Sequence, residues 1–264
     1  IEGNNVVDLY YGNSGAKTTT LSFWVKSSLT GNFPVGLENS ASNRTHVKQY
    51  TINSADTWEK KSVTFVGDET GTWLITNGIG LMVNFVLGAG SNYTGTIDSW
   101  QGSRLYRGSS SVQFMATVNA TYFVTGVQLE VGSTATDFEY RTFGEELALC
   151  QRYYEQSYNY GVAVGTTTYD GGSFVGGSAT TRTTGYIAGG SIDFRVEKRG
   201  DPTIVAYDQA GASGKSQRYE LGVSNTNNSA IAIGHTDLRN FMCYSNTGSN
   251  ATGLFLHFTA TAEL

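Results

Sequence analysis

The sequence predicts an all-β protein made of two antiparallel β-sandwich domains of jelly-roll type, joined by a short α-helix. Only 15% of the 264 residues are charged, and 33 glycines stand against two prolines. Such a composition, rich in Thr, Val and Tyr, favours strands and turns. Several segments alternate apolar and polar residues at period two, with Gly-, Ser- and Asn-rich turns between them. Strands at this spacing without intervening helices are typical of antiparallel sandwiches.

The first domain is expected over residues 1–142. Leu21, Phe23 and Val25 alternate with outward positions, and residues 79–87 give the cleanest alternation in the chain. A change of parity near Gly126 predicts a β-bulge there. Trp24 and Trp58, which lie within or beside apolar strands, are expected in the core, while Trp73 fits either environment. The core of this domain is predicted to include Leu81, Val83, Phe85, Leu129 and Val131.

Residues 143–157 interrupt the β pattern and predict a linker helix. Leu147, Cys150 and Tyr154 are spaced i, i+3 and i+7, which places them on one helix face. Acidic residues begin the segment and Arg152 ends it, as the helix dipole favours. A helix this short is marginal alone, so the apolar face must pack on something. Two partners stay open: the base of a sandwich, or a seam between subunits.

The second domain is expected over residues 158–264. Its candidate strands are separated by loops rich in Gly, Ser and Asn, notably 170–181 and 245–252. The candidate strands are Tyr160–Thr168, Gly185–Phe194, Thr203–Asp208, Ser216–Val223, Ala230–Gly234 and Gly253–Ala262.

Composition also limits the partners. A net charge of −5 and a pI near 5.2 argue against nucleic acid, which requires a basic surface. The sequence contains no apolar run of membrane-spanning length, so insertion into a membrane is not expected. Cys150 and Cys243 are too few for a secreted disulfide scaffold, and both are predicted to be free thiols that are buried or half-buried.

The sequence predicts no catalysis. The available bases are His46, His235 and His257, and none stands in a nucleophile motif. His257 lies in an alternating strand, where a structural role is expected, and His235 precedes a local Asp237 that could orient it or share a metal. A pair of carboxylates for glycoside hydrolysis stays open but is disfavoured, because the chain is short and lacks β-helix periodicity.

No cofactor is predicted either. The cysteine and histidine spacings do not match a zinc site. A structural calcium ion stays an open alternative, with Asp68 and Glu69 as the acidic doublet of the first domain. A solvated turn is the simpler expectation for that doublet.

Two groups of residues are candidate ligand-binding sites. Aromatic planes can stack on sugar rings while amides and carboxylates read the hydroxyls. The alternative for Trp100 and Tyr106 is that they cap the sandwich edge. Distal loops of the second domain are favoured for receptor contact, and the first-domain loop for contact between subunits. The candidates are Tyr93, Asp98, Trp100 and Tyr106 in the first domain, and Tyr169, Asp170, Phe174 and His235 in the second.

The segment FVTGVQLEVGSTATDFEYRTFGEELALCQRYYEQ, residues 123–156, combines a closing strand, a DFEYR turn and a short helix. It resembles a junction in bacteriophage tail-fibre and virion-appendage proteins, where a carbohydrate-binding-module-like jelly roll precedes a C-terminal β-domain. The resemblance extends to LSFWVKSSLTG and TWEKKSVTFVGDETGTW upstream, and to FRVEKRGDPTIVAYD and LHFTATAEL downstream. It also implies that the segment at Ile1 continues an earlier strand.

The resemblance implies a virion structural protein, a tail fibre or receptor-binding appendage assembled in the host cytoplasm. Its expected partners are further copies of itself in a homotrimer, other virion proteins and a host cell-surface glycan, bound without catalysis. The trimer would be held by the helix face of Leu147, Cys150 and Tyr154 together with the second domain. Two alternatives stay open: a head fibre, capsid-decoration or connector protein, and a carbohydrate-binding module of a polysaccharide-degrading enzyme.

Overall fold

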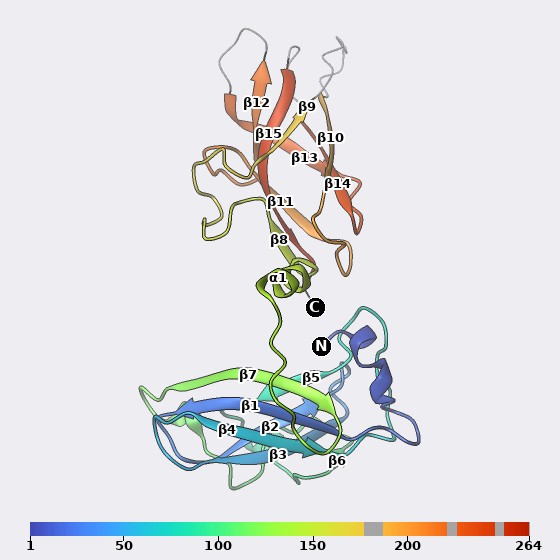
Figure 1. The fold of residues 1–264 in the computed structure, drawn as a ribbon, viewed down its shortest axis with the longest axis vertical. Helices are drawn as coiled ribbons and strands as arrows, with labels where there is room; N and C mark the ends of the chain where they lie inside the picture. Colours follow the sequence, from blue (N-terminus) through green and yellow to red (C-terminus); the bar gives the residue numbers. More distant parts are fainter. Residues whose placement is uncertain (177–186, 221–225, 246–250, 264) are drawn as a thin grey trace. The chain divides into compact units, whose positions relative to one another are not determined.

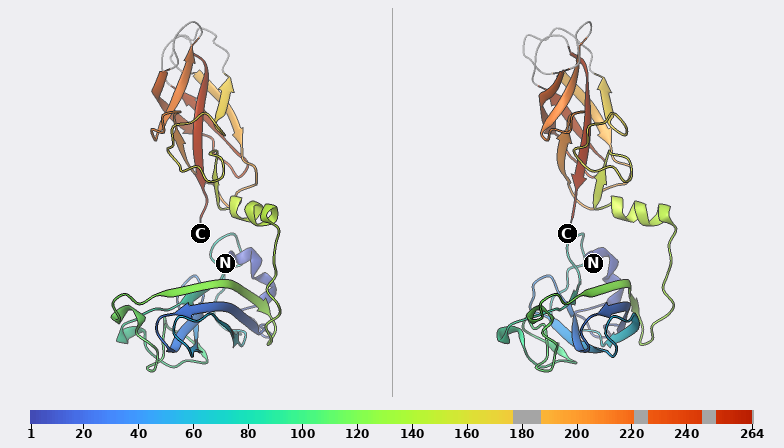
Figure 2. Two further views of the ribbon diagram at one scale, coloured as in Figure 1. Left: turned by 60° about the vertical axis from the view of Figure 1, so that its left-hand side comes forward. Right: turned by 90° about the vertical axis from the view of Figure 1, so that its left-hand side faces the viewer.

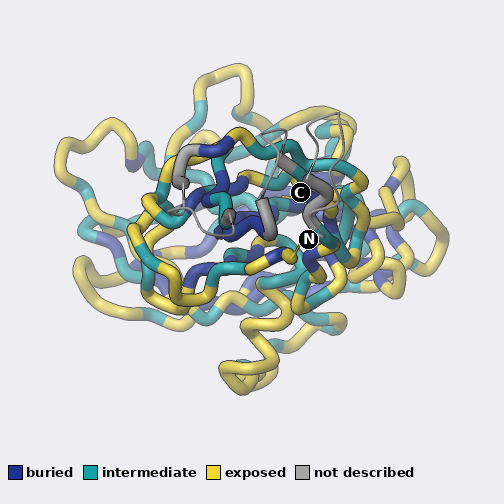
Figure 3. Tube along the Cα trace, turned by 90° about the horizontal axis from the view of Figure 1, so that it is seen from above, coloured by how far each residue is buried: buried dark blue, intermediate teal, exposed yellow. Residues whose placement is uncertain are grey.

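The computed structural model describes residues 1–176, 187–220, 226–245 and 251–263. Their chain forms antiparallel β-sheets with a single α-helix, which confirms the predicted all-β class. Two compact units follow one another along the sequence, Ile1–Tyr140 and Arg141–Leu264 (Figure 1). Figure 3 marks along the chain which of the described residues are buried, intermediate or exposed.

The first unit contains two sheets. One has the strand order β4-β1-β7, and the other has the order β5-β2-β3-β6. The four short 3-10 helices of this unit are η1 (Gly3–Asn5), η2 (Val7–Leu9), η3 (Ser91–Tyr93) and η4 (Phe114–Ala116). The strands are β1 (Thr19–Ser27), β2 (Gly31–Glu38), β3 (Thr45–Ile52), β4 (Glu59–Phe65), β5 (Met82–Phe85), β6 (Trp100–Gln101) and β7 (Tyr122–Val131).

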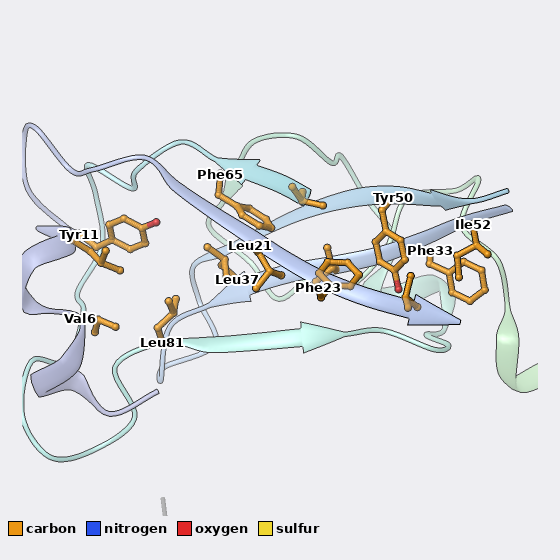
Figure 4. Packing of buried hydrophobic residues seen from close by; sticks show 14 of the residues in the cluster. Val6, Tyr11, Leu21, Phe23, Phe33, Leu37, Tyr50, Ile52, Phe65 and Leu81 are labelled. Carbon is orange, nitrogen blue, oxygen red and sulfur yellow. The ribbon is translucent and has the colours of Figure 1, made fainter. Parts of the chain in front are cut away.

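The core of the first unit combines the inward positions of both sheets with apolar residues of the short helices and loops, such as Val6 and Tyr11 (Figure 4). Leu21, Phe23 and Val25 of β1 are buried, as their alternation predicts. The Phe23 ring meets the rings of Tyr50 and Phe85 edge-on, at centroid distances of 4.9 and 5.0 Å. Such contacts between aromatic edges and faces stabilise a core beyond the area that they bury.

The predicted core residues of the edge strands are less buried than the alternation suggests. Leu81 is fully buried as predicted, while Val83, Phe85 and Leu129 are half-buried and pack against the core. Val131 was expected in the core and is 47% exposed, so that prediction is wrong. The reason is that β7 is an edge strand, and Val131 at its end lines an open pocket at the side of the sandwich.

The predicted bulge in β7 is confirmed. Ser22 pairs with Gln128 and Trp24 with Thr125, so two residues of β7 stand opposite Phe23. Gly126, one of these two, has a φ of 58°, a left-handed conformation that glycine adopts without strain. The bulge changes the parity of the strand at this point and explains why its apolar positions do not keep one register.

The expectation that Trp24 and Trp58 lie in the core is wrong. Each is 42% exposed. Trp24 stands between the buried residues Phe23 and Val25, so strand parity directs its indole to the outer face of the sheet. Trp73, for which either environment was open, is buried, and its Nε1 donates a hydrogen bond to Asp68 Oδ2 over 3.2 Å.

The second unit is built on one sheet of eight strands. Its main order is β10-β14-β13-β12-β15-β11, and β8 and β9 also pair with β15. The strands wrap around one core (Figure 2). They are β8 (Tyr154–Gln156), β9 (Ser173–Gly176), β10 (Ile187–Asp193), β11 (Thr203–Tyr207), β12 (Lys215–Glu220), β13 (Thr226–Gly234), β14 (Asn240–Ser245) and β15 (Ala251–Thr261).

The long strand β15 organises this sheet. Its first half pairs with β12 and β9, and its second half with β11 and β8. Leu256, Phe258 and Ala260 alternate along it and are buried in the core. The predicted strand 160–168 is instead a loop, and β8, β9 and β14 were not predicted. Parts of two predicted strands, 185–186 and 221–223, lie outside the described residues.

The helix of the second unit, α1 (Phe143–Gln151), is shorter than predicted. A capping box fixes its start: the Glu145 amide donates to Thr142 Oγ1, and the Thr142 amide donates to Glu145 Oε2. The helix ends before Tyr154. This residue belongs to β8 instead, where it pairs with Thr261 of β15. Pairing with the sheet therefore overrides the helical spacing. No described helix is both long and apolar enough to cross a membrane.

A buried ion pair fixes the C-terminal end of α1 to the sheet. The Lys198 Nζ lies 2.6 Å from Glu155 Oε2 and donates to the Gln151 carbonyl over 2.6 Å. The Lys198 side chain has no exposed surface and that of Glu155 is 3% exposed. The Arg195 amide donates to both oxygens of Glu155. Because a buried charge needs such partners, this group ties the helix end, β8 and residues 195–198 together.

Both cysteines are free, as predicted. Cys243 is buried, and this burial raises the pKa of its thiol to about 11. Cys150 is exposed on α1, which contradicts the expectation of a buried or half-buried thiol. Cys150 is exposed because α1 packs no residue into the core, and the thiol lines an open surface beside the helix.

Two phenylalanines in contact should differ in their contribution to stability. Phe23→Ala is expected to lower the free energy of unfolding of the first unit by about 3–5 kcal/mol, because the side chain is fully buried. Phe85→Ala should cost roughly half as much, since Phe85 lies on an edge strand and is half-buried. Denaturant unfolding of both variants measures this difference. Equal losses would show that the edge strand is packed as tightly as the sheet centre.

Candidate functional site

The loop between β5 and β7 brings two of the predicted ligand-binding residues together. Tyr93 ends η3, and the Tyr106 amide donates to the Tyr93 carbonyl over 2.9 Å. Their rings lie 5.5 Å apart at 40°. Backbone bonds hold the loop on the β5-β2-β3-β6 sheet: Asp98 donates to Val47, and Val112 donates to Asn32. We call this feature the tyrosine pair, meaning Tyr93 and Tyr106.

A buried carboxylate lies beside the tyrosine pair. Glu38, the last residue of β2, is 1% exposed and accepts a hydrogen bond from Asn84 Nδ2 over 2.7 Å. Its other oxygen accepts from Arg104 Nε over 3.0 Å. The guanidinium of Arg104 in turn lies 5.4 Å from the centre of the Tyr106 ring. Glu38 therefore anchors the same loop that carries the tyrosine pair, through charge-assisted hydrogen bonds.

The electrostatics keep these groups in defined charge states. Burial, and then the negative charge of Glu38, raise the pKa of Tyr106, so its hydroxyl stays protonated at neutral pH. The Glu38 carboxylate also raises the pKa of Arg104. The site thus combines a neutral phenol, which interacts with both Arg104 and Glu38, with a permanent cation.

The arrangement suits recognition of a polar ring. Tyr93 is 43% exposed and the Arg104 side chain is 49% exposed, so part of the aromatic ring and part of the guanidinium side chain reach solvent. Aromatic faces bind the C–H faces of ring compounds, while guanidinium donors bind oxygen atoms. The loop and sheet hold both in place before any ligand arrives, which lowers the entropic cost of binding.

Trp100 belongs to the core edge and not to the tyrosine pair. Its ring meets those of Tyr11, His46 and Trp73 at centroid distances of 5.7, 5.1 and 5.4 Å. Its Nε1 donates to the Val66 carbonyl over 2.8 Å. This is the edge-capping alternative that the sequence left open.

Asp98 lies in the same loop at a left-handed position with a φ of 66°. Its carboxylate is exposed and lies 3.3 Å from Lys48 Nζ. Of the four predicted first-unit residues, the structure therefore brings Tyr93 and Tyr106 together and gives Asp98 and Trp100 other neighbours.

The predicted residues of the second unit are only partly assembled. The exposed Phe174 packs against Tyr219 at 5.2 Å, and Tyr169 packs against Phe255 at 5.2 Å. The Tyr169 hydroxyl accepts a hydrogen bond from Gln217. Asp170 and His235 are both exposed. Asp170 follows Tyr169 in the chain, whereas His235 lies in the turn between β13 and β14, with a φ of 45°.

Leu147, Cys150 and Tyr154, the predicted oligomer contacts, line one concave apolar surface of about 330 Å³ in the second unit. Phe143 and Tyr160 contribute to the same surface, and their rings lie 5.7 Å apart. We call it the α1 groove. The capping box shows where the helix starts, so Phe143 could have been assigned to this face from the sequence, whereas Tyr160 lies beyond the helix.

The histidine in β15 serves the structure. His257 is fully buried and stacks on Tyr158 with ring centres 4.0 Å apart. Its Nε2 lies 3.0 Å from the Thr168 carbonyl and its Nδ1 lies 3.1 Å from Ser157 Oγ. The carbonyl can only accept, so Nε2 donates and Nδ1 accepts. This Ser–His contact lies inside the unit and joins the loop 157–168 to the sheet.

Only half of the acidic doublet of the first unit fits the expected solvated turn, because Glu69 is exposed and Asp68 is not. Asp68 is buried, and both its oxygens accept from Arg44, at 2.8 and 2.5 Å. Thr70 donates to it as well. These bonds occupy the carboxylate and hold its pKa below the usual range against the effect of burial. Within the described parts of the chain, we find no group of three or more His, Cys, Asp or Glu residues placed to hold a metal ion.

Comparisons with known proteins add little. The chain matches no protein-family model and no curated protein. Among solved structures, recombinant discoidin II of Dictyostelium discoideum aligns with 95% of this chain and 75% of that chain. The two are 9% identical, and the TM-score is 0.26. A likeness this weak carries no argument about the present chain.

The buried His46 should make the first unit sensitive to acid. Neither ring nitrogen has a hydrogen-bond partner among the described residues, and burial, with Lys48 nearby, lowers the pKa of His46 to about 4. Between pH 6.5 and 4 the unfolded chain binds a proton that the folded chain does not. Stability contributed by the neutral ring is therefore lost as the pH falls through this range, by up to about 1.4 kcal/mol per pH unit.

The measurement is thermal unfolding of wild type and His46→Leu at pH 7 and pH 4.5. The variant should lose part of the acid sensitivity, because leucine cannot titrate and leaves no unpaired polar atom. If both proteins lose the same stability on acidification, His46 does not control the response.

Proposed function

We propose that this chain is a receptor-binding element of a bacteriophage virion, a tail fibre or comparable appendage, which binds a host surface glycan without catalysis. The virion assignment rests on the sequence resemblance around residues 123–156. The glycan assignment rests on one observation, the tyrosine pair beside Arg104 and the buried Glu38. Exposed aromatic faces with fixed polar groups are what a sugar site requires.

The tyrosine pair supports receptor contact better than the second-unit residues do. Arg104 is anchored by Glu38 and still half exposed, so it can donate to a ligand without losing its position. In the second unit, the Tyr169 hydroxyl is already bonded to Gln217. We therefore reverse the preference drawn from the sequence and propose the first-unit loop for receptor contact.

A glycan array with the full chain tests this proposal. Wild type should bind a defined set of host glycans, and Tyr93→Ala should weaken that binding roughly tenfold, as expected for losing about 1.4 kcal/mol of stacking. Tyr169→Ala is the matched control, since it removes a half-exposed tyrosine from the other candidate group. Tyr93→Ala should melt like wild type, and Tyr169→Ala should stay folded while losing the Phe255 contact and the Gln217 hydrogen bond.

Other outcomes would favour the alternatives. Loss of binding in Tyr169→Ala alone would move the receptor site to the second unit. A wild-type protein that binds no glycan would favour a head-fibre, decoration or connector role. Release of reducing ends from a bound polysaccharide would show that the chain belongs to a degrading enzyme.

We also propose that the protein is a homotrimer assembled through the α1 groove. The groove is apolar and its helix has no buried residue, so a second copy could cover it. Leu147→Glu should give monomers in mass photometry at micromolar concentration, because it places a charge in the groove. Leu149→Glu, on an exposed helix position outside the groove, should leave the trimer intact. A monomeric wild type would refute the proposal.

A further inference from the structure

The outer face of the β4-β1-β7 sheet carries an exposed aromatic surface. Trp24 and Lys26 stand two residues apart on β1, so they share one face, and Phe123 of β7 pairs directly with Lys26. Trp58 precedes β4 by one residue, next to the pairing of Val25 with Glu59. We call this the Lys26 surface, defined by Trp24, Lys26, Trp58 and Phe123.

These aromatic side chains are unusually open for their size. Trp24 and Trp58 are each 42% exposed, and Phe123 is 48% exposed. Val25, which lies between Trp24 and Lys26, is fully buried. Strand alternation therefore places Trp24 and Lys26 on the opposite, outer face of the sheet. Gly126 in the bulge of β7 lies beside the indole of Trp24, because a Cβ at this position would be in van der Waals contact with Trp24 Cδ1, at 3.4 Å. Exposed apolar surface gathered in one place indicates an interaction site.

Lys26 adds a positive charge at the centre of this surface. Its Nζ lies 4.9 Å from the ring centre of Phe123 and 5.5 Å from that of Trp58. No ion pair between described residues includes Lys26. The closest acidic residue in the register, Glu59, is bonded to Lys61, Asn53 and Ser54. In a chain of net charge −5, this ammonium is held on aromatic rings without a carboxylate.

The chemistry of the surface selects its ligand. Flat aromatic faces on a rigid sheet suit the C–H faces of sugar rings. An unpaired ammonium among them suits a carboxylate, through a charge-assisted hydrogen bond. Charge complementarity therefore favours an acidic saccharide chain over a neutral one.

We propose that the Lys26 surface is a second saccharide site, which binds an acidic polysaccharide. Its uronic-acid rings stack on Trp58 and Trp24, and one carboxylate meets the Lys26 ammonium. The Lys26 surface lies on the β4-β1-β7 sheet, whereas the tyrosine pair lies in a loop held on the β5-β2-β3-β6 sheet. The two sites share no residue. The proposal therefore extends the proposed function and can fail independently of it.

Affinity electrophoresis of the full chain tests this proposal, with polygalacturonate, alginate or hyaluronate cast into the gel and dextran as the neutral control. Wild type should be retarded by at least one acidic polymer and not by dextran, and added salt should weaken the retardation. Trp58→Ala and Lys26→Gln should each raise the dissociation constant at least tenfold. Lys17→Gln, which removes an exposed ammonium outside the Lys26 surface, should bind like wild type, and Tyr93→Ala tests whether the polymer binds at the tyrosine pair instead.

The site is refuted if wild type binds none of the three acidic polymers, or if both Lys26-surface variants bind as wild type does. Loss of binding in Tyr93→Ala alone would place the acidic ligand at the tyrosine pair and also refute it. Sedimentation without polysaccharide provides a further test. Self-association of wild type that Trp58→Ala abolishes would assign the surface to protein contact and overturn the proposal.

Discussion

Glu38 is the constraint on which the candidate site depends. A carboxylate buried at the end of a central strand must be paired, because an isolated buried charge would cost more than the fold can supply. Asn84 supplies one partner from the adjacent strand, and Arg104 supplies the other from the loop. Arg104 reaches Glu38 from the loop that also carries Tyr106, and the Tyr106 amide bonds to the Tyr93 carbonyl. The Glu38 pairing and this backbone bond together position the tyrosine pair.

In the second unit, a buried charged pair likewise fixes the segment that carries an exposed surface. Lys198 and Glu155 are both buried, and their partners include the last carbonyl of α1. This group fixes the helix end while the helix itself contributes nothing to the core. Leu147 and Cys150 are consequently held in defined positions and remain uncovered. In each unit, a buried charge fixes a backbone segment whose exposed side chains are then free to bind a partner.

The sequence predicted what depends on local periodicity and missed what depends on distant partners. Alternation along β1 identified Leu21, Phe23 and Val25 as core residues. The change of parity in β7 identified the bulge at Gly126. The same alternation directs Trp24 outward, and this strand parity prevails over the hydrophobicity of the side chain. Tyr154 has the spacing of a helical residue, but it lies in β8 because it pairs with β15. Glu38 left no sequence signal, since its partners lie 46 and 66 residues away.

The tyrosine pair is expected to hold a sugar ring beside Arg104. A crystal structure of the full chain with an oligosaccharide that it binds in solution would test this arrangement. We expect a sugar ring within about 4 Å of Tyr93 or Tyr106, with a hydroxyl or carboxylate oxygen accepting a hydrogen bond from Arg104. An oligosaccharide bound only in the second unit, with the tyrosine pair unoccupied, would contradict it.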